Sequence, residues 1–309
     1  MRVTQSMLSS NMLRNLNASY GKMSKYQDQL QSGKVVNRPS DDPVVAVKGM
    51  GYRVDLDKNA QFQRNINEAN SWLDSTDEAL GQVGEALKRV KELVVQAAND
   101  TNTLEDRQKI NAEITQIKEQ IRDLGNSKIG ENYIFSGTHT NSPLYTDDPL
   151  KIDPITGQNT DVTTGAGKSI EVNVFDGIKM QINTPGNEYF EKVDKFMTEL
   201  DDLLQNGATG EEIGSALGLT TENGLPGLDA LNEEALTLRA DVGARQNRVE
   251  MMENRLSLQE VNVTKQKSLN EDTDYPKTIT EMITQESLHQ ASLSVGAKII
   301  QTTLVDFIR

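Results

Sequence analysis

One run of apolar residues constrains the fold more than any other feature of this 309-residue chain. Between Ile66 and Ala97, apolar or small side chains recur at alternating steps of three and four, as on one face of an α-helix. At about 1.5 Å per residue such a helix spans on the order of 50 Å, so we expect a rod that needs partner helices. Its positions are Ile66, Ala69, Leu73, Thr76, Leu80, Val83, Leu87, Val90, Val94 and Ala97.

Further helices follow from the same spacing. Seams run from Ile110 to Leu124, from Phe190 to Leu203 and from Leu228 to Val263. Aromatic residues make up only 5% of the chain and hydrophobic residues 36%, which favours thin helical bundles over a thick globular core. The sequence therefore predicts antiparallel helices joined by short connections.

A different pattern interrupts the helices between residues 136 and 187, where Gly, Thr, Asn and Pro are frequent. Apolar residues alternate with polar ones from Ile170 to Val174 and from Ile178 to Ile182, and Asp176-Gly177 lies between the two runs. This is the pattern of a β-hairpin, because a tight turn requires positive φ. We expect a small β insertion at the far end of the helical stem.

Each end of the chain has its own helical stripe. The first stripe is narrow, and since most helical stability comes from packing, it needs a partner. We interpret Leu13, Leu16, Tyr20, Met23 and Leu30 as assembly residues of an N-terminal arm. The last helix has a wider apolar face, and we interpret it as an assembly or partner-binding face made of Leu293, Ala297, Ile300, Leu304 and Phe307.

The segment between the first arm and the long helix is predicted to be a hinge. Ser32-Gly33 can end a helix, and proline pushes the residue before it toward extended geometry. Ser40 or Asp41 can cap the next helix, with Pro43 in its first turn. A plain helix-loop-helix corner is the alternative reading, and the connection before Pro276 is expected to lie beside this one. The hinge residues are Gly33, Asn37, Pro39, Asp41, Asp42 and Pro43.

The predicted fold class is mainly α, a long helical bundle or coiled coil built from both chain ends with a small inserted β domain. Residues 1–45 and 271–309 form terminal helical assembly arms. Residues 46–135 and 188–270 form a helical rod domain, and residues 136–187 form the inserted β domain.

No catalytic, cofactor-binding or metal-binding residues are predicted. The chain has no cysteine, and its two histidines, His139 and His289, lie far apart in sequence. Asp41-Asp42 is read as helix-capping and solvated charge rather than as a catalytic or metal-binding pair.

Charge and hydropathy argue against other partners. The net charge is −14, with nine acidic residues and no Lys or Arg between Glu199 and Leu238, which argues against nucleic-acid binding. No run approaches the roughly 20 apolar residues that span a bilayer. If the protein leaves the cell, we expect it to do so without a cleaved signal.

Several segments resemble bacterial flagellins. Leu30–Pro43 is similar to the segment that follows the first helix in that family, and Val242–Glu250 resembles its Gly-Ala-x-x-Asn-Arg segment. The chain ends Met1–Gln5 and Thr303–Ile308 agree with this. Within the family, Arg38–Pro43 and Tyr133–Thr138 look more like the members that join hook to filament than like filament flagellins.

This resemblance implies a secreted structural subunit at the hook-filament junction of the bacterial flagellum. Its partners would be other copies of itself in a ring, a neighbouring hook-associated protein and filament flagellin. It also implies export through the flagellar type III apparatus and a cytosolic chaperone that covers the C-terminal helix. Filament flagellin and, less favoured, a cytosolic coiled-coil scaffold are the alternatives.

Overall fold

The computed structural model describes residues 5–99, 101–146, 152, 158–160, 168–218 and 226–305. The described chain is predominantly helical, and its strands form two small two-stranded sheets, which confirms the predicted fold class. It divides into two compact units. Unit 1 comprises residues 1–59 and 258–309, and unit 2 comprises residues 60–257. The predicted three-part division has other boundaries and stays a prediction.

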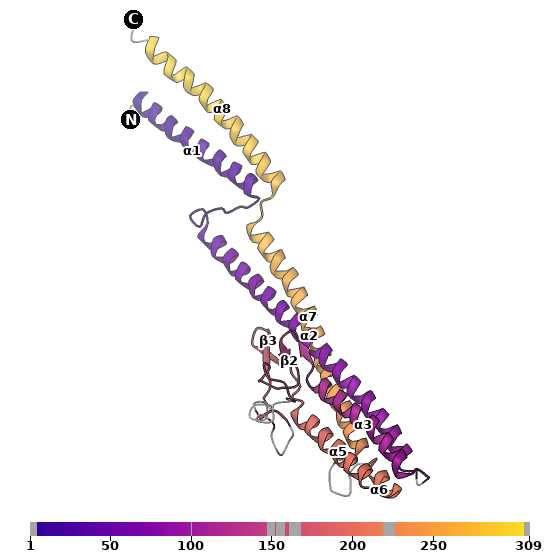
Figure 1. The fold of residues 1–309 in the computed structure, drawn as a ribbon. Helices are drawn as coiled ribbons and strands as arrows, with labels where there is room; N and C mark the ends of the chain where they lie inside the picture. The colour runs from indigo at the N-terminus through magenta and orange to yellow at the C-terminus, as the bar shows by residue number, and fades with distance from the viewer. Residues whose placement is uncertain are drawn as a thin grey trace. The chain divides into compact units, whose positions relative to one another are not determined.

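Unit 1 contains α1 (Gln5–Ser32) and α8 (Tyr275–Val305), which pack against each other as an antiparallel pair (Figure 1). It also contains the first turns of α2 (Pro43–Ala97) and the last turns of α7 (Leu228–Glu271). α2 starts and α7 ends beside the two connections to the arms, so these two helix segments also run in opposite directions.

Unit 2 is organised around the rest of α2. All ten positions of the seam predicted from Ile66 to Ala97 are buried, including Thr76, whose hydroxyl donates to the carbonyl of Trp72 (2.7 Å). α3 (Leu104–Gly125) and α5 (Asn187–Gln205) pack against each other and add their own apolar faces to this core. α6 (Gly210–Ser215) follows. In α5 the buried residue near the C-terminus is Leu204 rather than the predicted Leu203, because the helical step after Leu200 is four residues.

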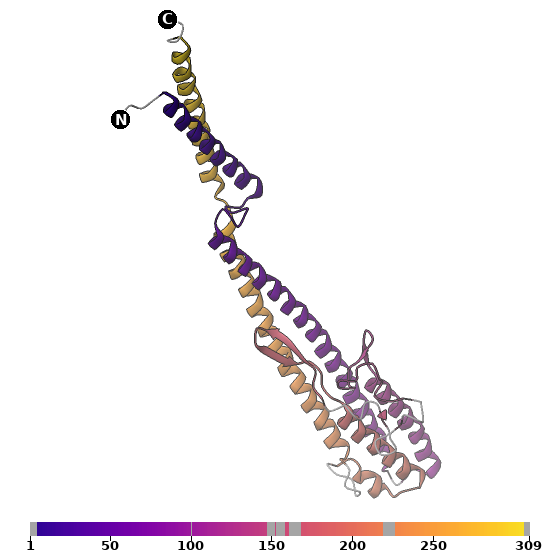
Figure 2. The same ribbon diagram turned by 90° about the vertical axis from the view of Figure 1, so that its left-hand side faces the viewer.

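The predicted hairpin is present in unit 2. β3 (Glu171–Phe175) pairs antiparallel with β4 (Ile178–Gln181), and Gly177 in the turn has φ +72°. A smaller pair, β1 (Lys128–Ile129) with β2 (Asn132–Tyr133), follows α3. The apolar run Tyr133-Ile134-Phe135, whose composition predicts a short strand, overlaps β2 only at Tyr133. Figure 2 shows the larger hairpin alongside α7.

The expected position of the hairpin was wrong. The hairpin packs on α2 close to where unit 2 begins at Ala60. There Phe175 stacks on Phe62, with ring centroids 6.2 Å apart. The guanidinium of Arg255 lies 4.0 Å from the centre of the Phe175 ring, and Asn65 donates to the carbonyl of Asn173 (2.7 Å). These contacts place the hairpin along the helices rather than at the Ala97 end, because an aromatic side chain in β3 has an apolar partner there.

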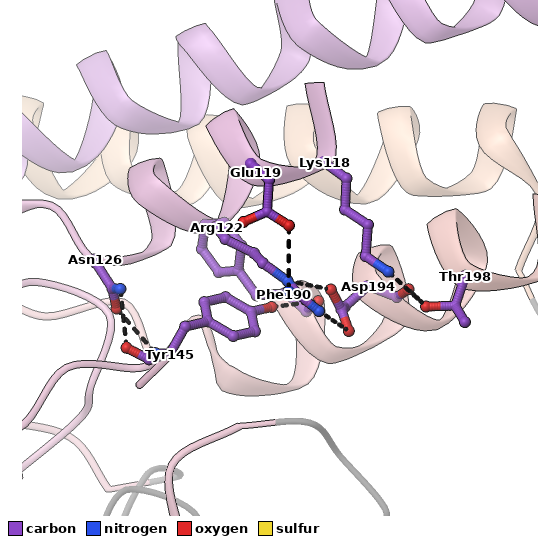
Figure 3. A network of polar contacts seen from close by, with 8 residues as sticks. All are labelled: Lys118, Glu119, Arg122, Asn126, Tyr145, Phe190, Asp194 and Thr198. Atoms are coloured by element: carbon purple, nitrogen blue, oxygen red, sulfur yellow. Dashed lines mark hydrogen bonds and ion pairs between the residues drawn. The ribbon is translucent and has the colours of Figure 1, made fainter. Parts of the chain in front are cut away.

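A polar network ties α3 to α5 at the entrance of the β region (Figure 3). The guanidinium of Arg122 donates to both carboxylate oxygens of Asp194, at 2.8 and 3.2 Å, and lies over the ring of Tyr145. Burial raises the pKa of Tyr145, so its hydroxyl stays protonated and donates to the carbonyl of Phe190 (3.0 Å). Asn126 holds the backbone of Tyr145 from the other side with two hydrogen bonds.

Candidate assembly surfaces and hinge

The first arm ends where the sequence predicted. α1 stops at Ser32, and Gly33 follows with φ +71°. Residues that have a Cβ rarely adopt this backbone conformation. Its N–H donates to the carbonyl of Gln29 (2.8 Å), which closes the last turn of the helix. A Cβ at Gly33 would also stand 2.9 Å from the hydroxyl of Tyr275. Glycine is therefore required here both for its conformation and for its size.

The start of α2 is capped by Asp42, which corrects the prediction of Ser40 or Asp41. The Asp42 carboxylate accepts hydrogen bonds from the N–H groups of Val44 (3.0 Å) and Val45 (3.1 Å). Pro43 is the first helical residue, where its missing N–H leaves no bond unmade. Asp41 has a different task, because its carboxylate accepts from the N–H of Arg38 (3.1 Å) and holds the preceding turn.

The two connections between arms and inner helices lie side by side, as expected. Lys34 and Asp272 form an antiparallel bridge. The N–H of Val35 donates to the carbonyl of Glu271 (2.7 Å), and that of Thr273 donates to the carbonyl of Gly33 (2.9 Å). The hinge is therefore cross-linked by main-chain hydrogen bonds between segments far apart in sequence.

Side chains of α1 fasten the same connection. The amide of Gln29 donates to the carbonyl of Val35 (2.7 Å), and Asn37 donates to the carbonyl of Asp28 (3.1 Å). Both bonds tie side chains of one segment to the main chain of the other. Pro39 is exposed and lines a groove of about 140 Å³ with Met50 and Arg53. The predicted hinge residues thus lie together in unit 1.

Glu271 is the charged centre of the hinge and was not among the predicted site residues. Its side chain is 6% exposed, and the guanidinium of Arg53 reaches its two oxygens at 2.9 and 2.8 Å. Lys34 adds a longer contact of 3.6 Å. Burial opposes ionisation, but Arg53 together with Lys34 and Lys267 outweighs it and holds the pKa of Glu271 below its ordinary value.

Space for this carboxylate comes from Gly49 of α2. A Cβ at Gly49 would overlap Oε1 of Glu271, so the helix carries a glycine where the carboxylate lies against its backbone. No local pattern could reveal this arrangement, because Arg53 and Glu271 are separated by 218 positions. A glycine within the first turns of a predicted helix is the one available signal.

The contact face between α1 and α8 is rich in small and polar groups. The amide of Gln285 donates to the hydroxyl of Ser19 (2.7 Å), and the rings of Tyr20 and His289 lie 6.2 Å apart. Gly296 has no Cβ where the side chain of Met12 enters, and a substituent there would overlap it. On α8 this face lies one position before the stripe predicted for assembly.

The predicted assembly residues divide into two groups. Leu16, Met23 and Leu30 are half-buried, whereas Leu13 is 59% exposed and Tyr20 62%. On α8, Leu293 is 46% exposed and Ala297 is exposed. The side chains of Ile300 and Leu304, and the whole of Phe307, lie outside the described residues.

Other exposed apolar side chains lie near those stripes. Ile279, Ile283, Leu288 and Val295 on α8 and Met7 on α1 are all exposed. A groove of about 400 Å³ between the arms is lined by Asn11, Met12, Asn15, Leu288, Ala291, Ser292 and Val295. The pair therefore leaves much of its apolar surface in contact with solvent.

No cluster of three or more His, Cys, Asp or Glu side chains suited to a metal occurs among the described residues. Within the same residues, no helix has a long enough apolar run to cross a membrane. His289 faces Tyr20 within the arm pair.

Two family models match the chain. The bacterial flagellin N-terminal helical region matches residues 3–140, and the bacterial flagellin C-terminal helical region matches residues 225–308. Together they cover the arms, the hinge and most of the long helices. The chain belongs to the flagellin family of flagellar structural proteins.

Comparison with individual proteins shows which members of the family the chain is similar to. The chain is 25% identical to flagellar hook-associated protein 3 of Escherichia coli (strain K12) over 94% of this chain and 95% of that protein. It is 27% identical to flagellin of Bacillus subtilis (strain 168) over 96% of each. A solved structure from Vibrio parahaemolyticus, assigned as a flagellar hook-associated protein, has a TM-score of 0.62 at 23% identity, covering 75% of this chain and 99% of that one.

Proposed function

We propose that this chain is a structural subunit of the bacterial flagellum at the junction between hook and filament, assembled through α1 and α8. One observation carries the assembly role. The two arms pair through small and polar groups and leave Leu13 and Leu293 exposed. Full-length similarity to hook-associated protein 3 supports the place of that assembly.

The exposed apolar surface can supply the free energy of assembly. Burying one large apolar side chain contributes about 1.5–3 kcal/mol, so several on each arm yield a substantial driving force. Since the surface runs along two helices, the partner would be other helices with the same pattern. We infer that these partners are further copies of this chain in a ring, a neighbouring hook-associated protein and filament flagellin.

The proposal also includes the route by which the chain reaches the junction between hook and filament. We infer export through the flagellar type III apparatus, with a cytosolic chaperone covering the α8 face of Leu293, Ala297, Ile300, Leu304 and Phe307 before export. Removing residues 293–309 is expected to abolish co-purification with the chaperone. The fluorescence of Trp72 should stay that of the folded chain, which shows that unit 2 remains folded. Leu13→Asp, on the other arm, is the control that keeps chaperone binding. Undiminished binding after the truncation contradicts this step.

Filament flagellin is the second candidate, because identity to the Bacillus subtilis flagellin also extends over the whole chain. Deleting the gene in the source bacterium separates the two. Loss of a junction subunit leaves hooks without filaments and sheds flagellin into the medium. Loss of filament flagellin removes that shed protein as well. Normal filaments after deletion would contradict both and favour a cytosolic scaffold.

The arm surface is tested by complementing the deletion with Leu13→Asp combined with Leu293→Asp. Both side chains are exposed, so the chain is expected to fold normally but to restore few or no filaments. Asn17→Asp with Gln290→Asp is the matched control, since it adds the same charges at exposed polar positions on the same helices. Full restoration by the first pair would contradict assembly through these residues.

A further inference from the structure

Unit 1 has two more apolar stripes, outside the arms. The α2 stripe consists of Val44, Val47, Met50 and Val54, and the α7 stripe consists of Leu258, Val261 and Leu269. All seven side chains are exposed, with Val47 at 68% and Leu269 at 79%. Single exposed apolar residues are ordinary, but a row of them at helical spacing forms a patch that marks an interaction site.

The two stripes point in opposite directions. Gly49 and Glu271 touch each other and therefore lie on the contact face between α2 and α7. Val47 lies two positions before Gly49, and Leu269 lies two positions before Glu271. Two positions correspond to about 200° around a helix, so each residue faces away from the partner helix.

Two further stripe residues obey the same rule. Val54 lies midway between Tyr52 and Leu56, which are half-buried, and Val261 lies midway between half-buried Gln259 and Val263. The outer face of α2 is thus apolar from Val44 to Val54, and the outer face of α7 carries Leu258, Val261 and Leu269, with exposed Lys265 between the last two. The two faces lie on opposite sides of one helix pair.

Two unlike stripes on opposite sides of one helix pair suit a second copy of the chain as the occupant. A symmetric dimer would bury one stripe against itself and leave the other in water. Head-to-tail contact buries both stripes in every copy and repeats around a ring. Because α2 and α7 are antiparallel, copies with a shared orientation would meet through the same antiparallel geometry that the pair uses within the chain.

We propose that the α2 stripe of one copy packs on the α7 stripe of the next, forming the lateral contact of the ring. This rests on the proposed function, because it assigns the surface through which the self-assembling subunit meets its own copies. In this arrangement the arms make contacts other than the lateral one. The two stripes alone form the contact between neighbouring copies in the ring.

Cysteine cross-linking tests this contact directly, since the chain has no cysteine of its own. Val47→Cys and Leu269→Cys are made singly and together, and flagella isolated from complemented cells are treated with a short bis-maleimide. The double variant is expected to give a ladder of multimers. Each single variant is expected to stay monomeric, because like stripes do not meet. Asp55→Cys with Glu260→Cys, at exposed positions outside the stripes, is the matched control without a ladder.

Every other outcome of the cross-linking experiment also either supports or overturns the proposal. A dimer from either single variant shows a symmetric contact and overturns the proposal, as does a double variant present in flagella without a ladder. If only the stripe double variant is missing from flagella while its Trp72 fluorescence is native, the stripes are needed for assembly, which supports the proposal. A wild-type chain missing from flagella overturns the proposed function itself.

Discussion

The α2 seam of unit 2 and the α1–α8 pair of unit 1 have the same three-four spacing of apolar residues. They differ in the kind of side chain that the helix contact buries. In the α2 seam, residues such as Leu73 and Leu80 are fully buried. In the arm pair, the contact runs through Ser19, Gln285 and Gly296, and apolar neighbours remain exposed. Spacing therefore identifies a helix and its faces, but it does not say whether a face is buried within the chain or kept for a partner.

The largest expected difference between the two regions concerns stability. Leu80→Ala should lower the free energy of unfolding of unit 2 by about 2–5 kcal/mol, because it leaves a cavity in a closed core. Leu13→Ala in the arm should change the free energy of unfolding of unit 1 by less than about 0.5 kcal/mol. Denaturant titration followed by the fluorescence of Trp72, the single tryptophan and a buried one, measures the first change, and hydrogen exchange of the α1 amides measures the second. Equal losses would mean that the regions do not differ as described.

A smaller effect is expected from filling the space beside Glu271. Gly49→Ala should destabilise unit 1 by about 1–3 kcal/mol, because its Cβ displaces the carboxylate from Arg53. Gly51→Ala is the control on the same helix. Nothing lies within 4 Å of its Cβ position, so alanine should stabilise the helix by about 0.5–1 kcal/mol. Hydrogen exchange of the Val35 amide reports both, and equal shifts for the two variants would contradict the account of Gly49.

The cap of α2 gives a still smaller contrast. Asp42→Ala should cost about 1 kcal/mol, because two N–H groups at the helix start lose their acceptor. Ser40→Ala should leave stability unchanged, since the structure assigns the cap to Asp42. Amide exchange at Val44 and Val45 is the readout. Faster exchange in the Ser40 variant alone would restore the original cap assignment.

The smallest expected effect is a pH dependence of the hinge. The pKa of Glu271 is lowered in the folded chain, so its contribution to stability is complete above the ordinary carboxyl pKa. It is lost as the pH falls through the lower folded value. Val35 exchange, corrected for intrinsic rates, should thus lose protection in acid, and Glu271→Gln should remove that step. An unchanged acid response in the variant would assign it to another group.

Much of this architecture could be predicted from sequence because it depends on local pattern. The seam from Ile66 to Ala97, the turn at Gly177 and the stop at Gly33 all rest on neighbouring residues. The adjacency of the two connections also followed, since proline interrupts both halves of the chain. These features need no knowledge of distant partners.

The features that were missed depend on residues distant in sequence. The Arg53–Glu271 ion pair joins residues 218 positions apart, and the hairpin's position depends on Phe62 meeting Phe175. On α8, the side chains that meet α1 lie one position before the stripe predicted for assembly, and no sequence pattern singled them out. Pairing of two helices with several possible faces is decided by shape, as at Met12 and Gly296.

The bonds between the two connections also bear on the order of folding. Val35 bonds to Glu271, and Thr273 bonds to Gly33, so the joint requires the chain's first and last parts at once. Contacts of such long sequence separation form late, because a large loop must close before they yield any free energy. A chain still emerging from synthesis can complete unit 2's helices before residues 271–273 are available to close this joint. Closure of the hinge therefore marks the stage at which α8 is ready to pair with α1.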